Sequence, residues 1–304
     1  MIPTLLRPAT AGTSGQGLLP VLALSLLVLG LAGCGPRDER STLERIREDG
    51  VVRVGFANEA PYGFTDTATG RVTGEAPEIA RVILADMGVE DMDGVQTEFG
   101  SLIPGLNAGR FDIVAAGMYI LPDRCEQVAF SNPTYGIGEA LVVPAGNPKA
   151  LHSYEDIRDN EDATIGVVVG AIQWDYALDM DIPENRIERF PDHTSAVAGV
   201  RSGRVDAYAG TALTVQRIID RDETGEIERA DPFENPVIDG EEVRGYGAFA
   251  FRQEDQDMVA EFNARLADFI GSEEHLELVR DFGFTEEELP GDVTAEELCA
   301  RGES

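Results

Sequence analysis

Three loops that follow predicted strands carry side chains suited to holding a small zwitterion. Glu59 and Tyr62 follow the first strand, Phe99 lies near the next sheet edge, and Tyr119 and Arg124 follow a third strand. A guanidinium holds a carboxylate through two parallel hydrogen bonds, and each aromatic face attracts a delocalised cation by about 0.5–2 kcal/mol. Glu59 would accept the N–H donors of that cation. Any one aromatic could instead be a core residue, and Arg124 a surface arginine, but the shared position at strand ends favours a binding site.

The elements that must position these loops alternate between strands and helices after residue 50. Apolar, β-branched runs predict strands, and apolar residues at helical spacing with capping residues predict helices. The predicted strands are 51–56, 111–116, 140–143, 164–169, 205–209 and 246–251, and the predicted helices include 75–87, 193–201, 211–220 and 258–270. Such alternation is typical of mostly parallel sheets covered by helices, where ligands bind beyond the carboxyl ends of the strands.

A short motif that occurs twice favours two lobes of similar build. The sequences GRFDI at 109–113 and GRVDA at 203–207 each follow a helix that a glycine ends, and each leads into a strand. We expect the chain to cross between the lobes near residues 143–148 and 235–245. The first lobe would then comprise residues 42–145 and 241–304, and the second lobe residues 146–240.

The motifs of common enzymes are absent. The sequence has no G-x-S-x-G, P-loop, H-E-x-x-H or G-x-G-x-x-G, and its three histidines (His152, His193 and His275) lack the spacing of metal ligands. This favours binding over catalysis, with no catalytic residue, cofactor or metal.

Composition excludes several classes of protein. The chain has 304 residues, 56 acidic against 24 basic, and a formal charge of −32, which would repel nucleic acid. A hydrophobic content of 43% argues against disorder, and three cysteines are too few for a disulfide scaffold. Lys149 is the single lysine. This surface is typical of a halophile, although a GC-rich genome that encodes arginine in place of lysine would explain the missing lysines equally well.

The first 33 residues are typical of an export signal. An apolar core at 21–31 is too short to span a membrane, and Leu31-Ala32-Gly33-Cys34 resembles a bacterial lipobox, with cleavage before Cys34 and lipid on its sulfur. The alternative is a plain secretory signal whose cysteine is accidental. Residues 34–41 would form a tether. Cys125 and Cys299 then remain, and in an oxidising compartment they most simply form a disulfide, the alternative being two separate buried thiols.

Over roughly Thr42 to Cys299 the sequence resembles the substrate-binding proteins of bacterial ABC importers, in the polar amino-acid group called family 3. The matching segments are VRVG at 52–55, SLIPGL at 101–106, GRFD at 109–112, PDR at 122–124, FSNP at 130–133 and GRVDA at 203–207. The resemblance implies a type II periplasmic binding protein fold, with two α/β lobes joined by a two-segment hinge. It also implies that Arg124 binds the ligand carboxylate. The usual ammonium-binding Asp is replaced by Thr211, and Leu121 cannot supply a hydroxyl often found before the P-x-R element.

Within that family the sequence is most similar to ectoine- and hydroxyectoine-binding proteins. The similarity rests on the loop 57–62 with Glu59 and Tyr62, on Phe99 and Tyr119 as the other cage aromatics, on Arg124-Cys125, and on Leu298-Cys299-Ala300. A departure is Gly170-Ala171-Ile172, where these proteins tend to offer a small hydroxyl residue. Ile172 and Trp174 are therefore the candidates for the second lobe, although Trp174 could simply be a buried packing residue.

Together these features predict a monomeric, lipid-anchored receptor in the periplasm or on the outer face of the cytoplasmic membrane. It would capture ectoine or hydroxyectoine between its lobes, close about a hinge and deliver the solute to an ABC permease. One alternative is a receptor for another polar amino acid or a betaine-like solute. Another is an enzyme on the same fold, such as a prephenate- or arogenate-type dehydratase.

Overall fold

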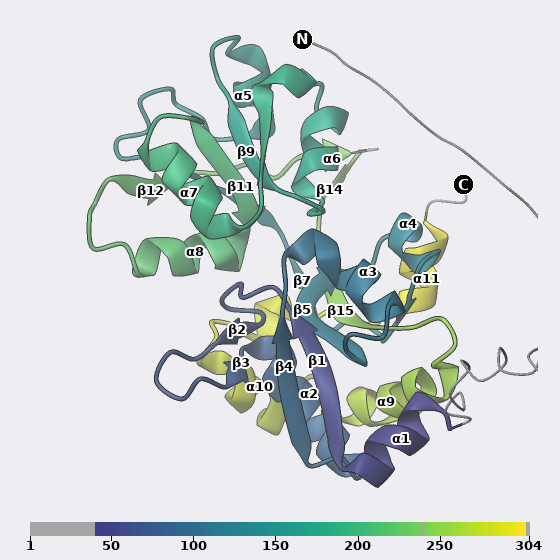
Figure 1. Ribbon diagram of the computed structural model, residues 1–304. Coiled ribbons are helices and arrows are strands. Elements are labelled where there is room, and N and C mark those ends of the chain that lie inside the picture. The colour runs from purple at the N-terminus through teal and green to yellow at the C-terminus, as the bar shows by residue number, and fades with distance from the viewer. Residues whose placement is uncertain (1–39, 239, 302–304) are drawn as a thin grey trace, which may run out of the picture. The chain divides into compact units, whose positions relative to one another are not determined.

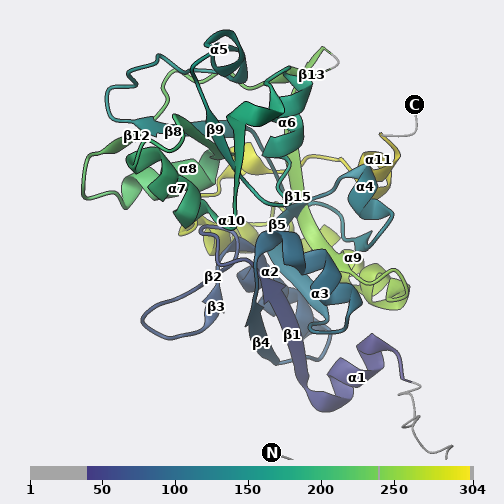
Figure 2. The same cartoon turned by 45° about the horizontal axis from the view of Figure 1, so that its top comes forward.

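The computed structural model describes residues 40–238 and 240–301 and contains two main sheets (Figures 1 and 2). The predicted signal peptide, Cys34 and most of the predicted tether lie outside the described residues. In the first lobe the strand order is β4 (Asp91–Gln96), β1 (Val51–Phe56), β5 (Ile113–Tyr119), β15 (Gly245–Phe251) and β6 (Ala129–Phe130), and β7 (Tyr135–Ile137) also pairs with β15. Strand β1 is parallel to β4 and β5, whereas β15 is antiparallel to its neighbours.

Helices cover both faces of the first sheet (Figure 1). Apolar residues of α1 (Thr42–Asp49), α2 (Glu75–Asp86), α9 (Gln256–Phe269) and α10 (Glu273–Arg280) pack in one core cluster. Those of α3 (Leu102–Asn107), α4 (Pro122–Cys125) and α11 (Ala295–Ala300) pack in another. The remaining elements are the 3-10 helices η1 (Phe99–Ser101) and η3 (Glu286–Glu288) and the small hairpin of β2 (Phe64–Thr65) and β3 (Val72–Thr73).

The second lobe is built around a five-stranded sheet. Its strand order is β10 (Ile187–Phe190), β9 (Ile165–Val168), β11 (Ala207–Thr211), β8 (Glu139–Pro144) and β12 (Ile227–Arg229). Helices α5 (Tyr154–Asp159) and α6 (Gln173–Asp179) contribute to one core cluster, and α7 (His193–Arg201) and α8 (Ala212–Asp220) to the other. The 3-10 helix η2 (Glu184–Arg186) precedes β10, and a short hairpin joins β13 (Val237–Ile238) to β14 (Glu241–Glu242). The expected type II periplasmic binding protein fold, two α/β lobes with a two-segment hinge, is confirmed.

The first crossing between the sheets differs from the prediction. Strand β8 pairs with β11 and β12, so it belongs to the second lobe and not to a first lobe that ends at residue 145. The chain crosses at Gly138, between β7 and β8, and the buried run 140–143 gave no signal of which sheet it joins. The side chain of Asn235, from the returning crossing, accepts a hydrogen bond from the backbone N–H of Glu139 over 2.7 Å. The two hinge segments therefore contact each other.

The repeated motif places an equivalent carboxylate in each lobe. Oδ2 of Asp112 accepts from the backbone N–H of Arg53 over 3.1 Å, and Oδ2 of Asp206 accepts from the backbone N–H of Thr164 over 2.9 Å. Each acid immediately precedes one strand and bonds to the backbone of the neighbouring parallel segment: Asp112 precedes β5 and bonds within β1, and Asp206 precedes β11 and bonds just before β9. The two lobes thus share a local construction, as the repeat predicted.

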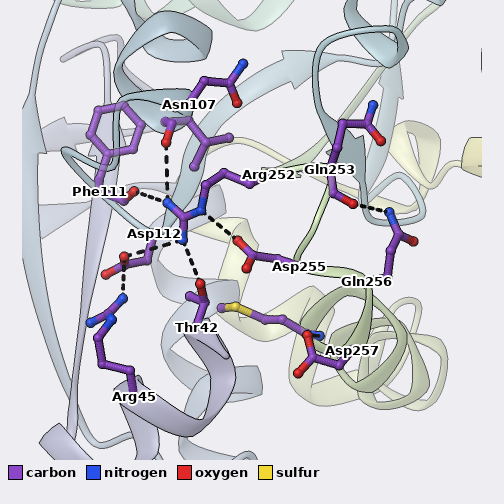
Figure 3. A network of polar contacts seen from close by, with 12 residues as sticks. Thr42, Arg45, Asn107, Phe111, Asp112, Arg252, Gln253, Asp255, Gln256 and Asp257 are labelled. Atoms are coloured by element: carbon purple, nitrogen blue, oxygen red, sulfur yellow. Dashed lines mark hydrogen bonds and ion pairs between the residues drawn. The ribbon is translucent and has the colours of Figure 1, made fainter. Parts of the chain in front are cut away.

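A buried arginine ties distant segments of the first lobe together (Figure 3). The guanidinium of Arg252 donates to the carbonyl of Phe111 over 2.9 Å and to the Thr42 hydroxyl over 2.9 Å. It also forms an ion pair with Asp255 at 3.0 Å and lies 3.7 Å from Asp112. Burial acts against ionisation of Asp112, but hydrogen bonds and charges from Arg53 and Arg45 hold the pKa of that carboxyl below its usual range. This network attaches α1 to the sheet that carries the first-lobe site loops.

Candidate functional site

Six of the seven predicted ligand-binding residues line one cavity, which has walls from both lobes. They are Glu59, Tyr62, Phe99, Tyr119, Arg124 and Ile172. The cavity volume is about 40 Å³. Since a buried water takes roughly 10–15 Å³ of such space, there is room for about three waters. Any organic solute exceeds three waters in volume, so its entry requires the lobes to move apart.

Tyr62 is one of the aromatic residues that line the cavity. It is 2% exposed, and its ring stacks on Tyr135 with the centroids 5.1 Å apart. Its ring also lies directly against Gly117, which has φ +63°, and a Cβ at that glycine would lie 2.5 Å from the Tyr62 ring. A side chain at position 117 would both strain the backbone and displace the ring. The loop after β1 and the bend in β5 therefore fix Tyr62 together.

Tyr119 brings an unsatisfied polar group to the cavity. The residue lies at the end of β5, and its hydroxyl is buried without a hydrogen-bond partner in the described part of the chain. Burial raises the pKa of this hydroxyl well above its ordinary value, so it stays protonated at neutral pH. A buried donor of this kind is stabilised when a ligand acceptor reaches it.

Arg124 is buried beside the same cavity and contacts both lobes. Its Nη1 donates to the carbonyl of Tyr119 over 2.8 Å, and its Nη2 donates to the carbonyl of Gly170 over 2.9 Å. The guanidinium carbon lies 5.6 Å from the centroid of the Phe99 ring. Within residues 40–238 and 240–301 this guanidinium has no ion pair with a carboxylate, and its burial lowers the pKa. A guest carboxylate would supply the missing counter-charge.

Glu59 contacts the second lobe through its carboxylate. Its Oε1 accepts a hydrogen bond from the Thr214 hydroxyl over 2.8 Å, and Thr214 lies in the first turn of α8. Glu59 is the acidic residue of the cavity wall. It is thus the group of the site that can accept N–H donors as a full negative charge.

The second lobe contributes residues that the sequence did not single out as ligand-binding. Tyr208 and Thr211 of β11 line the cavity, as does Gln173 at the start of α6. The Gln173 amide donates to Glu139 over 2.7 Å, and burial raises the pKa of Glu139 to about 7. The rule that placed the first-lobe loops, the carboxyl end of a predicted strand, applied equally to 205–209 and would have pointed to Thr211.

Trp174 is not among the residues that line the cavity. Its half-buried ring packs against the second-lobe core, and the guanidinium carbon of Arg189 lies 3.4 Å from the ring centroid. Trp174 is therefore placed as a packing residue, which was the alternative to a ligand contact.

The cysteines predicted to pair form a disulfide. Sγ of Cys125 lies 2.08 Å from Sγ of Cys299, across a sequence separation of 174 residues. The bond joins α4, which carries Arg124, to α11 near the C-terminus of the described chain. It therefore holds one of the site helices against the first-lobe core.

The described residues contain neither a candidate metal cluster nor a candidate membrane-spanning helix. In residues 40–238 and 240–301 no group of three or more His, Cys, Asp or Glu side chains could hold a metal ion. Over the same residues, no helix has the length and apolar character needed to cross a membrane.

Comparison with known proteins gives a consistent picture. Residues 52–285 match the family model of bacterial extracellular solute-binding proteins, family 3. A probable amino-acid ABC transporter periplasmic-binding protein of Sinorhizobium fredii is 38% identical over 263 residues, covering 85% of this chain and 86% of that protein. The crystal structure of EhuB in complex with hydroxyectoine has 33% identity and a TM-score of 0.77, covering 86% of this chain and 100% of the other. An ancestral amino acid-binding protein, AncCDT-1, a precursor of cyclohexadienyl dehydratase, has 26% identity and a TM-score of 0.69, covering 80% and 99%.

Proposed function

We propose that this chain, which belongs to the bacterial extracellular solute-binding proteins of family 3, captures ectoine or hydroxyectoine. As a member of that family it is the binding component of an amino-acid-type ABC importer, which delivers a small ligand to a membrane permease, and it is not an enzyme. Its place is therefore the extracytoplasmic side of the membrane.

The observation that carries the proposal is the convergence of complementary groups on one cavity. Four aromatic rings, the buried Arg124 guanidinium and the Glu59 carboxylate all line it. Ectoine is a compact ring that contains a delocalised amidinium and one carboxylate. Its carboxylate would pair with Arg124, its N–H donors would reach Glu59, and the rings of Tyr62, Phe99 and Tyr119 would surround the amidinium. The resemblance to EhuB, which was crystallised with hydroxyectoine, supports the same ligand class.

Other solutes fit this set of groups less well. An ordinary α-amino acid would present a compact ammonium, and the position that carries an Asp in amino-acid-binding relatives is Thr211, whose hydroxyl is already bonded to Tyr62. Glycine betaine would favour the aromatic rings but has no N–H donor for Glu59. Ectoine uses every charged group of the cavity.

Calorimetry on the purified protein in high salt tests the proposal. The panel should contain ectoine, hydroxyectoine, glycine betaine and the common amino acids. We expect heat of binding with ectoine or hydroxyectoine, and the proposal fails if neither binds while a common amino acid does.

Alanine variants test the aromatic cage separately. Replacing Tyr62, Phe99 or Tyr119 should weaken ectoine binding by about 1–3 kcal/mol, because each ring is desolvated in the site. Tyr246→Ala is the matched control, since this half-buried aromatic contacts Arg301 and lies outside the cavity wall. Unchanged affinity in all three cage variants would remove the cage from the proposal.

The membrane attachment is a further part of the proposal. Cleavage before Cys34 and lipidation of its sulfur would anchor the protein through a short tether, leaving both lobes in the extracytoplasmic space. Mass spectrometry of the N-terminal peptide, with Cys34→Ala as control, should find diacylglyceryl on Cys34. Release of wild type into the soluble fraction, as for the variant, would argue for a plain secretory signal.

A further inference from the structure

A second cavity lies apart from the proposed solute site and has a different chemical character. It is formed by Ala60, in the loop after β1, together with residues of α7 and α8. Its volume is about 220 Å³. The titratable residues of its wall are His193, Arg201, Arg217 and Arg221, and no Asp or Glu is among the lining residues.

This concentration of positive charge runs against the composition of the chain. Acidic residues outnumber basic ones by 56 to 24, and in the first lobe Arg45 bonds to a carboxylate and Arg252 to a carbonyl. In the cavity, Arg201 forms an ion pair with Asp222 at 2.8 Å. The guanidinium carbon of Arg221 lies 5.9 Å from the centroid of the Phe64 ring, and its cation has no carboxylate partner in the described chain.

Arg217 gives the strongest indication of a ligand. Its Nε is buried and has no hydrogen-bond partner in residues 40–238 and 240–301. The Arg217 side chain also lines the cavity and has no carboxylate partner in the described residues, so an anion in the cavity would supply its counter-charge. Arg217 lies in the last turn of α8 and Arg221 is the residue that caps the C-terminal end of that helix, so the two arginines lie four residues apart at one helix end.

We propose that this cavity binds a small multivalent oxyanion of the phosphate or sulfate type. Guanidinium groups present planar forks of N–H donors that match tetrahedral oxyanions, and a dianion balances more of the charge here than a halide does. Thr194 adds a hydroxyl to the wall, and His193 adds a ring nitrogen. The proposal goes beyond solute capture, because this cavity shares no lining residue with the proposed solute site.

The net charge of −32 does not prevent such binding. At physiological ionic strength the Debye length is about 8 Å, so acidic residues on distant surfaces are largely screened. Guanidiniums in direct contact with the anion are screened much less. Anion binding should therefore be measured at this ionic strength, with chloride as the background salt.

Calorimetry with inorganic phosphate, and separately with sulfate, tests the proposal on the full chain without added solute. Wild type should show saturable binding with one anion per chain. Arg217→Gln should weaken that binding by about tenfold or more, since hydrogen bonds to charged groups are the strong ones. Arg110→Gln is the matched control, because Arg110 is exposed at the turn before β5 and lies outside both cavities. Its phosphate affinity should equal that of wild type.

Two further measurements and a replacement variant make the result decisive. Circular dichroism and the solute affinity of Arg217→Gln, which should stay within about twofold of wild type, show that the variant folds and that the solute site is separate. If Arg217→Gln fails to fold, Arg221→Gln takes its place with the same expectation. Absence of saturable phosphate and sulfate binding in wild type, or equal loss in the Arg110 control, overturns the proposal without affecting the proposed solute.

Discussion

The hydroxyl of Tyr62 donates a hydrogen bond to Oγ1 of Thr211 over 2.8 Å and joins the two lobes through side chains. Thr211 in turn bonds to the hydroxyl of Thr214 over 3.1 Å, and Thr214 donates to Glu59 over 2.8 Å. The chain of hydrogen bonds thus leaves the loop after β1 at Tyr62 and returns to it at Glu59. Because its donors all run in one direction, each bond polarises the next. This network stabilises the closed arrangement of the lobes.

Tyr62→Phe should shift the lobes toward an open arrangement in the absence of solute. The substitution keeps the ring but removes a donor worth about 1 kcal/mol to the closed form. The measurement is the distance distribution between two spin labels, one on each lobe.

Tyr135→Phe is the matched control for that experiment. Tyr135 stacks on Tyr62, but its hydroxyl donates to the carbonyl of Gly117 within the first lobe over 2.8 Å. Its removal should lower the stability of the first lobe and leave the distance between lobes unchanged. Equal distance distributions for wild type and Tyr62→Phe would show that this hydrogen bond does not hold the lobes together.

Arg124→Lys should weaken solute binding even though it preserves the positive charge. A lysine ammonium cannot donate to the carbonyls of Tyr119 and Gly170 and also bind a carboxylate through two parallel bonds. We expect a loss of about 1.5–3 kcal/mol in affinity, measured by calorimetry. Arg229→Lys is a suitable control, because Arg229 also bonds to a carbonyl, that of Ala212, but lies outside the cavity wall. Equal affinity of Arg124→Lys and wild type would contradict a role for the guanidinium fork.

The first-lobe half of the site could be predicted because its positions follow from parallel-strand geometry. The apolar run 51–56 identified β1, and the loop beyond its carboxyl end carries Glu59 and Tyr62. The same reasoning located Tyr119, which is the last residue of β5, and Arg124, which follows that strand. Strand β4 escaped detection because its sequence, DMDGVQ, is polar and mostly exposed at the sheet edge. Its register on β1 comes from backbone pairing, which a hydrophobic pattern does not report.

The second-lobe half of the site was harder to predict, because the direction of single side chains on a short helix determines which residues line the cavity. Helix α6 begins at Gln173, and successive residues on a helix point about 100° apart. Gln173 therefore turns toward the cavity and Glu139, whereas Trp174 turns toward Arg189 and the second-lobe core. The sequence pattern suggested the aromatic Trp174 as the ligand contact. Which of the two residues faces the cavity depends on where the helix begins, and this places Gln173 there.

Removing the disulfide should lower the free energy of unfolding by about 2–5 kcal/mol. The bond closes a loop of 174 residues, so much of its effect arises from restriction of the unfolded chain. The double variant Cys125→Ser/Cys299→Ser, measured by urea unfolding, should match wild type that has been reduced and alkylated. The control is the double variant treated with reductant, which should not change further. Identical midpoints for oxidised wild type and the double variant would show that the disulfide adds no stability.

The buried carboxyl of Glu75 should lower the free energy of unfolding as the pH rises. Its side chain is 1% exposed, Oε1 accepts from the Thr134 hydroxyl over 2.6 Å, and Oε2 is buried without a partner in the described residues. Burial raises the pKa of this carboxyl from 4.5 to about 7. Between these two values the folded state holds a proton that the unfolded state releases, so the free energy of unfolding falls with rising pH. The contribution is complete below pH 4.5 and is lost by about pH 7.

Glu75→Gln should remove this loss, because a glutamine keeps the hydrogen-bonding shape without an ionisable proton. The free energy of unfolding of the variant minus that of wild type should increase by roughly 3 kcal/mol between pH 4.5 and a pH above 7. Urea unfolding over a pH series measures this difference. Glu139, whose pKa burial also raises, is present in both proteins, so its contribution cancels in the difference. Glu78→Gln serves as control, since Glu78 lies on the same first turn of α2 but is partly exposed and paired with Arg81. Its curve should run parallel to that of wild type, and a parallel curve for Glu75→Gln would mean that Glu75 stays ionised in the fold.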